Sequence, residues 1–192
     1  MIAIIDYGAG NLNSVKNAFD FLGEESVIVS TPEAIDNANR IVLPGVGSFG
    51  FMMESLEKKK LIEPIKRAIA RGVPFFGICL GLQILFEESE ESKGVRGFGI
   101  FKGKVIKFQN GKVPQIGWNR ITSKNEFFEP GYAYFVNSYY VLPEDKNVIT
   151  TTTDYFGEFA SSIQYKNITA VQFHPEKSGE FGIEIFRRWL KC

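Results

Sequence analysis

The sequence predicts an α/β protein in which a mostly parallel central sheet is flanked by helices and carries an additional antiparallel β layer. Its first half alternates short apolar runs with segments whose apolar residues recur at helical spacing. This rhythm is typical of a parallel sheet with helices on both faces. From residue 95 to residue 172 strand-like runs dominate, separated by glycine and asparagine, and they favour antiparallel pairing. No repeat or obvious linker interrupts the chain, so we expect one domain over residues 1–192.

The elements of the first half follow from apolar patterning and from the glycines that end them. A strand over 1–6 leads to a helix over 11–22, which Gly23 terminates. The remaining runs of this half are short and β-branched or have helical spacing. We expect further strands over 26–30, 40–43 and 73–78, and further helices over 61–70 and 80–86.

The second half is expected to consist of strands followed by one helix. Alternating or β-branched runs predict the strands, and a helix over 179–190 gathers its large apolar residues on one face. The expected strands cover 100–108, 132–136, 139–142, 148–153, 159–165 and 169–173.

Composition limits the classes of partner. Lys+Arg and Asp+Glu balance at 22 each, which leaves no broad basic field for nucleic acid. The apolar runs are strand-sized, and residues 1–6 begin a strand in place of a basic leader. Two cysteines and one histidine make neither a disulfide framework nor a structural zinc site, and the glycine run at 8–10 lacks the third glycine of a dinucleotide fingerprint. We therefore expect a cytoplasmic protein with no metal, cofactor, nucleic acid or membrane partner.

Cys79 is the candidate nucleophile. It follows an apolar run and has Gly77 and Gly81 two residues to either side, which is typical of a strand that turns sharply into a helix with one side chain at the bend. A helix N-terminus favours the thiolate, the reactive form of cysteine. The alternative is a buried core cysteine, which is common for this residue type.

His174 is the only histidine, and Glu176 follows it by two residues. It comes just after an expected strand, and open α/β sheets place their chemistry at the carboxyl ends of strands. An imidazole there can accept the proton of Cys79 and pass it to a leaving amine, while a carboxylate fixes the tautomer. In an extended segment His174 and Glu176 would face the same side. The three residues form a candidate Cys-His-Glu triad, and a structural histidine is the alternative.

A glycine-rich loop over 44–47 provides a candidate oxyanion hole. It follows a strand, and its glycines allow backbone N–H groups to approach a ligand closely. We assign oxyanion stabilisation to the backbone N–H groups of Val46 and Gly47 and to that of Leu80, the residue after Cys79. An ordinary tight turn is the alternative.

These residues belong to seven short segments spread over essentially the whole chain: 5–11, 43–50, 77–83, 85–91, 117–119, 134–136 and 172–178. Together the segments resemble the class I (triad) glutamine amidotransferases. The Cys elbow and the His-Pro-Glu run are shared across that superfamily. The Phe-Glu-Glu-Ser, Gly-Trp-Asn and Tyr-Phe-Val runs resemble its glutaminase subunits of imidazole glycerol phosphate synthase. The resemblance implies a flavodoxin-like architecture.

The resemblance also implies an activity and partners. A thiol would attack the carboxamide of L-glutamine, ammonia would leave, and water would resolve the γ-glutamyl thioester to L-glutamate. The ammonia would pass to a (β/α)8-barrel cyclase in a heterodimeric lyase of histidine biosynthesis. Four positions match substrate-binding residues and four match partner-facing residues. The substrate set is Gln83, Glu91, Ser138 and Tyr139, and the partner set is Asn11, Trp118, Tyr134 and Lys177.

The substrate and partner positions also have plainer interpretations. The glutamates of 87–91 would form a solvated face, and Gln83, Trp118 and Lys177 would be ordinary core or surface residues. Gln115 and Asn137 stand where many relatives have histidine; neither belongs to the triad, but both leave the partner and pathway open. A glutaminase that feeds another acceptor, such as an anthranilate, pyridoxal phosphate or surface-sugar pathway, is one alternative, and a non-catalytic binding subunit is another. We expect weak activity of the free subunit, with the 44–47 loop reorienting when the partner binds.

Overall fold

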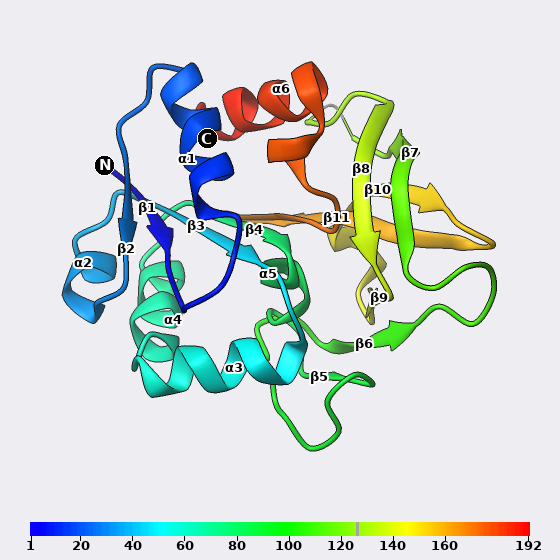
Figure 1. Ribbon diagram of the computed structural model, residues 1–192, viewed down its shortest axis with the longest axis horizontal. Coiled ribbons are helices and arrows are strands. Elements are labelled where there is room, and N and C mark those ends of the chain that lie inside the picture. The colour runs from blue at the N-terminus through cyan, green and yellow to red at the C-terminus, as the bar shows by residue number, and fades with distance from the viewer. Residues whose placement is uncertain (126) are drawn as a thin grey trace.

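The computed structural model describes residues 1–125 and 127–192, and a mixed nine-stranded sheet forms its centre (Figure 1). In chain order its strands are β1 (Ile2–Ile5), β2 (Ser26–Val29), β3 (Arg40–Gly45), β4 (Phe75–Cys79), β7 (Gln115–Ser123), β8 (Gly131–Asn137), β10 (Ile149–Asp154), β11 (Glu158–Tyr165) and β12 (Ile168–Val171). Their order across the sheet is β2-β1-β3-β4-β12-β11-β10-β7-β8. The pairs from β2 to β12 are parallel, and those from β12 to β8 are antiparallel.

A second sheet has the order β5-β6-β9, from β5 (Glu88–Ser89), β6 (Gly103–Lys107) and β9 (Tyr139–Pro143). The expected fold class is therefore confirmed, with one refinement. Most antiparallel strands extend the central sheet instead of forming a separate layer, because β11 turns back at residues 166–167 and pairs directly with β12.

Helices cover both faces of the central sheet. They are α1 (Leu12–Phe21), α2 (Pro32–Asp36), α3 (Phe49–Lys58), α4 (Ile62–Ala70), α5 (Leu80–Gln83) and α6 (Gly179–Trp189), with 3-10 turns η1 (Lys146–Val148) and η2 (Pro175–Lys177). Helices α1 and α6 lie on one face, and α2, α3 and α4 lie on the other (Figure 1). The inner parallel strands β1, β4 and β12 are buried on both faces and consequently read as mostly apolar runs, as in the buried Ile2–Ile5.

Aromatic packing joins α1 and α6 to the sheet. The ring of Phe19 lies 4.9 Å from that of Phe186, and Phe76 of β4 lies 5.4 Å from Trp189. Each such buried ring removes a large apolar area from water. This packing fixes α6, and with it the η2 turn before it, against the strand that ends in Cys79.

One expected element needs correction, and four elements are additions. The helix expected over 80–86 ends at Gln83, because the carbonyl groups of residues 84–86 accept backbone N–H groups from residues 98–101 instead of continuing the helix. Helices α2 and α3 and strands β5 and β7 were not expected. The start of α3 has a recognisable signal in Ser48, whose side chain accepts the Phe51 N–H as an N-cap.

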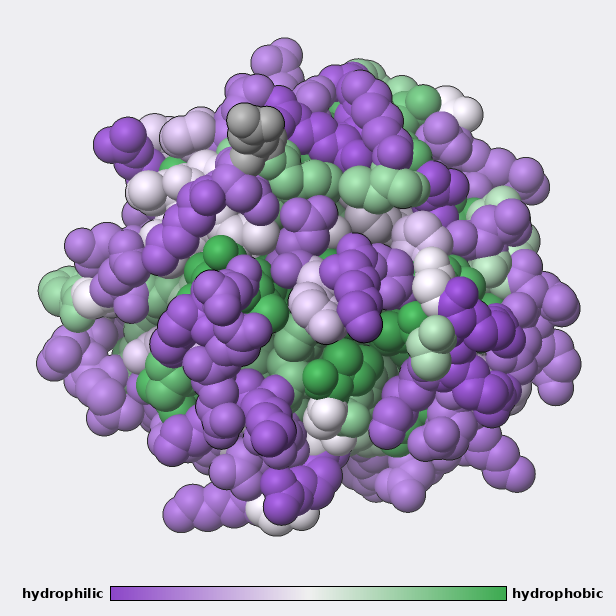
Figure 2. Space-filling model, turned by 180° about the vertical axis from the view of Figure 1, so that it is seen from behind, coloured by the Kyte–Doolittle hydropathy of each residue, from purple (hydrophilic) through white to green (hydrophobic). Residues whose placement is uncertain are grey.

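The face seen from behind is largely hydrophilic, with apolar residues gathered near its centre (Figure 2). None of the helices in the described ranges has the length and apolar character needed to cross a membrane.

Candidate active site

Cys79 stands at the bend between β4 and α5. Its backbone has φ 55° and ψ −106°, in the region that side-chain-bearing residues rarely adopt. The bend is tight enough to require both flanking glycines. A Cβ atom on Gly81 would lie 2.0 Å from the Leu43 carbonyl oxygen, and one on Gly77 would lie 2.6 Å from the Gly81 carbonyl oxygen. The expected strand-turn-helix elbow is therefore present.

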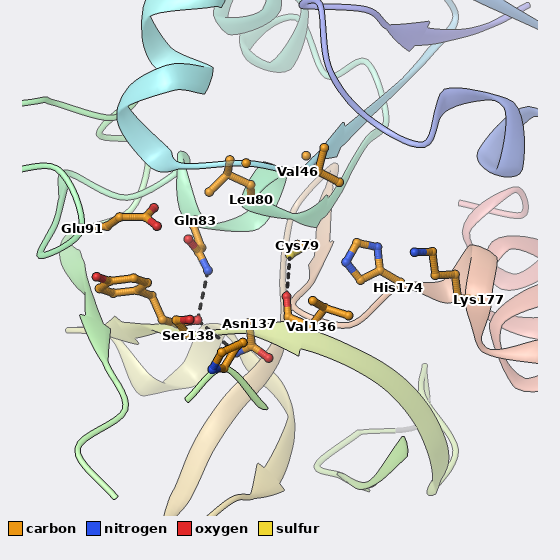
Figure 3. Close-up of a pocket in the computed structure, with 14 residues that line it drawn as sticks. Val46, Cys79, Leu80, Gln83, Glu91, Val136, Asn137, Ser138, His174 and Lys177 are labelled. Carbon is orange, nitrogen blue, oxygen red and sulfur yellow. Dashed lines mark hydrogen bonds between the residues drawn. The ribbon is translucent and has the colours of Figure 1, made fainter. Parts of the chain in front are cut away.

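His174 follows β12 and points its ring toward the elbow (Figure 3). Its Nδ1 lies 2.8 Å from Glu176 Oε1, and the two side chains are 5% and 2% exposed. Its backbone N–H donates to the Tyr134 carbonyl oxygen at 2.9 Å. The expected extended segment is wrong in detail, because Pro175 begins the 3-10 turn η2. The turn brings the carboxylate back onto the ring.

The electrostatics of His174 reflect both of these neighbours. Burial lowers the pKa of the ring, but the negative charge of Cys79 and a hydrogen bond to it, together with the hydrogen bond and charge of Glu176, raise that pKa to about 10. The ring of His174 is therefore held as an imidazolium at neutral pH. The second carboxylate oxygen of Glu176, Oε2, is buried without a hydrogen-bond partner. Glu176 therefore acts on the ring through the hydrogen bond of Oε1 and through its negative charge.

Two glutamines stand behind the sulfur. Gln172 is fully buried, and its Nε2 donates to Cys79 Sγ at 3.5 Å. Gln83 Nε2 in turn donates to Gln172 Oε1 at 3.0 Å and to the Tyr139 carbonyl oxygen at 3.1 Å. These bonds use both N–H groups of Gln83. No role was expected for Gln172, whose signal in the sequence is only a polar residue at the end of an apolar strand.

A cavity of about 310 Å³ opens in front of the sulfur (Figure 3). It brings together Cys79, His174, the three residues of the expected oxyanion hole and the four of the expected substrate set. Its volume lies at the lower end of the range for small-molecule sites. Glu176 is not among the described residues that line it and contacts His174 from the opposite side.

The cavity is acidic at the end formed by Glu91. Oε2 of Glu91 accepts the N–H of Phe49 at the start of α3, at 2.7 Å, a position that stabilises a carboxylate. Burial and the charges of Glu91 and Glu90 raise the pKa of Tyr139. A positively charged amino group fits this end of the cavity.

The backbone of residues 137–139 forms the cavity wall. The Tyr139 carbonyl oxygen accepts from Gln83 and, at 3.0 Å, from Asn137 Nδ2, so both of its lone pairs are used. The Ser138 carbonyl oxygen accepts the Phe108 N–H at 3.1 Å. The Tyr139 carbonyl oxygen therefore has no lone pair left for a substrate.

The oxyanion loop differs from expectation at one residue. The N–H of Val46 donates to the hydroxyl oxygen of Tyr7 at 2.9 Å and is not directed into the cavity, contrary to the role assigned to it. The loop nevertheless lies against the elbow, because a Cβ atom on Gly45 would come within 2.6 Å of the Leu80 Cβ.

A family model described as glutamine amidotransferase class-I matches residues 3–191. The chain belongs to the class-I glutamine amidotransferase family. The elbow cysteine, the buried histidine–glutamate pair and the acidic cavity are thus features of an amidotransferase.

Relatives and solved structures agree with this assignment. Proteins from Pyrococcus furiosus, Thermococcus kodakarensis and Aquifex aeolicus, each named imidazole glycerol phosphate synthase subunit HisH, are 50%, 49% and 47% identical to this chain. The matches cover 99%, 100% and 98% of this chain and 98%, 100% and 95% of those proteins. A crystal structure of a glutamine amidotransferase has a TM-score of 0.82 at 16% identity, covering 100% of this chain and 98% of that one. PurLQS from Thermotoga maritima has a TM-score of 0.81 at 20% identity, covering 99% and 97%. At these identities the two structures support the fold alone.

Beside the amidotransferase cavity, three of the four expected partner-facing residues are contiguous. The Trp118 ring lies 6.2 Å from that of Tyr134, and Lys177 Nζ lies 5.9 Å from the centre of the Tyr134 ring. Trp118 is 58% exposed. The fourth, Asn11, precedes α1, a helix that contacts η2.

The two departures from the family pattern face each other. Gln115 of β7 pairs with Asn137 of β8, and both side chains are buried. Gln115 Oε1 and Asn137 Oδ1 are buried without a hydrogen-bond partner. Of the two residues, Asn137 lines the cavity, and Gln115 lies beside it on the neighbouring strand.

Proposed function

We propose that this chain is the glutaminase subunit of imidazole glycerol phosphate synthase. In this proposal the single domain, residues 1–192, hydrolyses L-glutamine to L-glutamate and ammonia in the cytoplasm. The ammonia passes to a (β/α)8-barrel cyclase in a heterodimer of histidine biosynthesis. The observation that carries the proposal is the convergence of Cys79, His174 and Glu176 beside the cavity. Full-length similarity to HisH subunits supports the pathway.

Cys79 acts as the nucleophile. Its thiolate attacks the carboxamide carbon of glutamine, and the imidazolium of His174 donates a proton to the departing ammonia. A γ-glutamyl thioester remains on Sγ. His174, now neutral, takes a proton from water, which attacks the thioester and releases glutamate. Glu176 holds Nδ1, so that the other ring nitrogen faces the sulfur throughout.

The other cavity residues bind the substrate and the developing charge. The Leu80 and Gly47 backbone N–H groups stabilise the oxyanion, and Val46 joins them once its N–H is free. Glu91 accepts the α-ammonium group of glutamine. Gln83 assists with its amide oxygen, since its nitrogen is committed to protein acceptors.

The partner surface adjoins the mouth of the cavity. Lys177 both lines the cavity and lies over the Tyr134 ring, and Val136 likewise lines it while remaining 37% exposed. Around them the outward side chains of β7 and β8 are large and apolar, as in protein interfaces. We propose that this surface, with Asn11, contacts the cyclase and directs ammonia into it.

A variant of the nucleophile tests the proposal. Cys79→Ala is expected to abolish glutamate release, measured with the cyclase and its nucleotide ligand present, because no thioester can form. The same complex should keep a cyclase reaction driven by added ammonium salt. Cys192→Ala, which alters the exposed second cysteine, is the matched control and should retain full activity.

Full activity of Cys79→Ala would contradict the triad. Stimulation by a different barrel protein, and not by the histidine-pathway cyclase, would indicate a glutaminase of another ammonia-using pathway. Failure of a glutamine-analogue electrophile to label Cys79 in the complete complex would indicate a non-catalytic binding subunit.

A further inference from the structure

Gln172 lies beside Cys79 because of the register between two neighbouring strands. Strand β12 runs parallel to β4, with Val171 opposite Ile78. The next residues along the two strands, Gln172 and Cys79, therefore come side by side where the strands end. The backbone N–H of Gln172 donates to the Ser161 carbonyl oxygen at 2.9 Å, which keeps the residue paired with β11. Gln172 is 0% exposed, and its Nε2 donates to Cys79 Sγ at 3.5 Å.

The direction of the Gln172 amide is fixed by a backbone carbonyl group. Tyr139 O can only accept a hydrogen bond, so the Gln83 atom that lies 3.1 Å from it is the amide nitrogen (Figure 3). The same nitrogen lies 3.0 Å from the Gln172 amide, whose facing atom must accept and is therefore Oε1. The opposite end of this amide, which faces Cys79 Sγ, is consequently the N–H donor.

This arrangement favours the thiolate form of Cys79 over the thiol. The Gln172 nitrogen, a donor, lies 3.5 Å from Sγ, whereas the Val136 carbonyl oxygen, an acceptor for a thiol, lies 4.0 Å away. A hydrogen bond to an ionised group is about twice as strong as one between neutral groups, and burial strengthens it further.

Gln172 reaches the sulfur from the side away from the substrate. It is not among the described residues that line the cavity, so it can keep its contact while Sγ attacks a carboxamide from the cavity side. His174 gives up its proton to the departing ammonia, whereas an amide N–H keeps its hydrogen. Gln172 is therefore the same donor when the thiolate attacks and when it is released from the thioester.

We propose that Gln172 is a catalytic residue that stabilises the thiolate of Cys79, and that Gln83 fixes the direction of its amide. This role rests on the proposed glutaminase function and adds to it a donor that acts on the nucleophile itself. The thiolate is the reactive form of cysteine, so loss of this donor should be visible in the chemistry of Cys79 without glutamine.

The test is the pH dependence of alkylation of Cys79 by iodoacetamide. The Cys192→Ala subunit serves as the parent, because Cys192 is the second, exposed cysteine. Gln172→Met removes the amide and keeps a side chain of similar volume. Loss of a hydrogen bond to a charged group corresponds to a factor of about ten or more, so the midpoint of the pH–rate profile should rise by at least about one pH unit.

The rates on the two sides of this midpoint should change in opposite directions. A less stabilised thiolate is the stronger nucleophile, and this offsets about half of the loss on a logarithmic scale. Alkylation of Gln172→Met at neutral pH should therefore be at least about threefold slower than in the parent, and at alkaline pH, where both thiols are ionised, it should be faster. A glutamine with a merely structural role would not produce this reversal.

Two further variants separate the amide donor from the packing of the side chain. Gln172→Glu keeps the shape and the oxygen that accepts from Gln83, but it puts an oxygen where the donor was, so its midpoint should rise at least as far. Gln83→Met should raise the midpoint by a smaller amount, because the Gln172 amide loses its anchor. Added to Gln172→Met, it should have no further effect.

Gln164→Met is the matched control. Gln164 is a half-buried glutamine of β11 that pairs with Thr169 of β12, and it is not among the described residues that line the cavity. Its midpoint should equal that of the parent. The titratable groups around the sulfur are the same in every one of these proteins: His174 with Glu176 behind it, Glu91, Lys177 and Tyr7.

Glutamate release in the complex with cyclase and nucleotide ligand supplies the second measurement. Gln172→Met should lower kcat at least about threefold and leave KM for glutamine within about twofold, since Gln172 acts on the nucleophile. A Gln172→Met or Gln172→Glu profile that coincides with the parent's would overturn the proposal, and an unchanged Gln83→Met profile would overturn the part of Gln83. If the parent hydrolyses no glutamine even with the cyclase, the proposed function fails, while the alkylation profiles still decide whether Gln172 stabilises the thiolate.

Discussion

The charge on His174 depends on two residues that reach it from opposite sides. Cys79 approaches from the cavity and Glu176 from behind the ring. Both raise the pKa of the imidazole, against the effect of burial, so the ring stays protonated from neutral pH to about pH 10. A proton donor for departing ammonia is therefore already in place when glutamine arrives.

Glu176→Gln should lower the titration midpoint of His174. In wild type the carboxylate charge of Glu176 raises the pKa of His174. Because the substitution removes this charge, the midpoint should fall by at least about one pH unit. NMR of the ¹⁵N-labelled imidazole measures it without ambiguity, because the chain has a single histidine. Glu184→Gln removes a carboxylate that pairs with Arg187 and Arg188 and should leave the midpoint in place. An equal midpoint in wild type and Glu176→Gln would refute the electrostatic role of Glu176.

The sequence predicted the position of Cys79, His174 and Glu176 because each has a local signal: glycines around a strand end, or a polar residue just after a strand. Tyr7 and Gln172 also follow strands, but nothing near them in the sequence indicates which residues they bind. Their partners, Val46 and Cys79, lie 39 and 93 positions away in the sequence. Hydrogen bonds of this kind depend on how the strands are ordered in the sheet.

Among the elements, the junction of β3, β4 and α5 leaves very little space. Gly77, Gly81 and Gly45 each occupy a position where a Cβ atom would come within 2.6 Å of a neighbouring atom. The backbone at Cys79 is strained, and the surrounding packing keeps it so. The elbow is predictable from sequence, since its glycines are close to the cysteine. The early end of α5 is not, because it depends on hydrogen bonds to residues 98–101.

Gly81→Ala should destabilise the whole fold. The new Cβ atom would lie 2.0 Å from the Leu43 carbonyl oxygen, and β3 cannot move away without breaking its pairing with β4. We expect a loss of about 2–3 kcal/mol or more in the free energy of unfolding, measured by urea denaturation. Gly23→Ala is the comparison, because its φ of 75° is strained but open space surrounds it; it should cost about 1 kcal/mol. A Gly81→Ala protein as stable as Gly23→Ala would contradict the close approach.

In the whole molecule, the parallel and antiparallel halves of the sheet contribute different parts of the site. The oxyanion loop follows β3, Cys79 ends β4, and His174 lies just after β12. Because these strands are parallel, the three features lie at the same, carboxyl-terminal end of the sheet. Strand β8 adds Val136 and Asn137 from the antiparallel half. The βαβ rhythm predicted the first contribution. For the antiparallel half, the sequence predicted the strands but not that they extend the same sheet. That extension depends on the hairpin between β11 and β12.

The outer surface of β7 and β8 is the part of the molecule best suited to a protein partner. Ile116, Trp118 and Tyr132 are each about 60% exposed, and they alternate with less exposed residues along their strands. This alternation places apolar side chains outward on a strand pair that ends the sheet. We expect Trp118 to dominate the free energy of binding to the cyclase, since exposed tryptophans at interface centres are frequent hot spots.

Trp118→Ala should accordingly weaken the complex without destabilising the subunit. A hot-spot residue contributes at least about 2 kcal/mol, so the dissociation constant should rise about thirtyfold or more, as measured by calorimetry. Wild-type binding can be followed independently by fluorescence, because the other tryptophan, Trp189, is 1% exposed and should not respond. Tyr165→Ala is the control. Its ring is 47% exposed, but it lies at the turn from β11 into β12, at the opposite end of the strands from the cavity. Equal affinities of Trp118→Ala and Tyr165→Ala would place the cyclase on another surface, and ammonia would then have to leave the cavity by a different side.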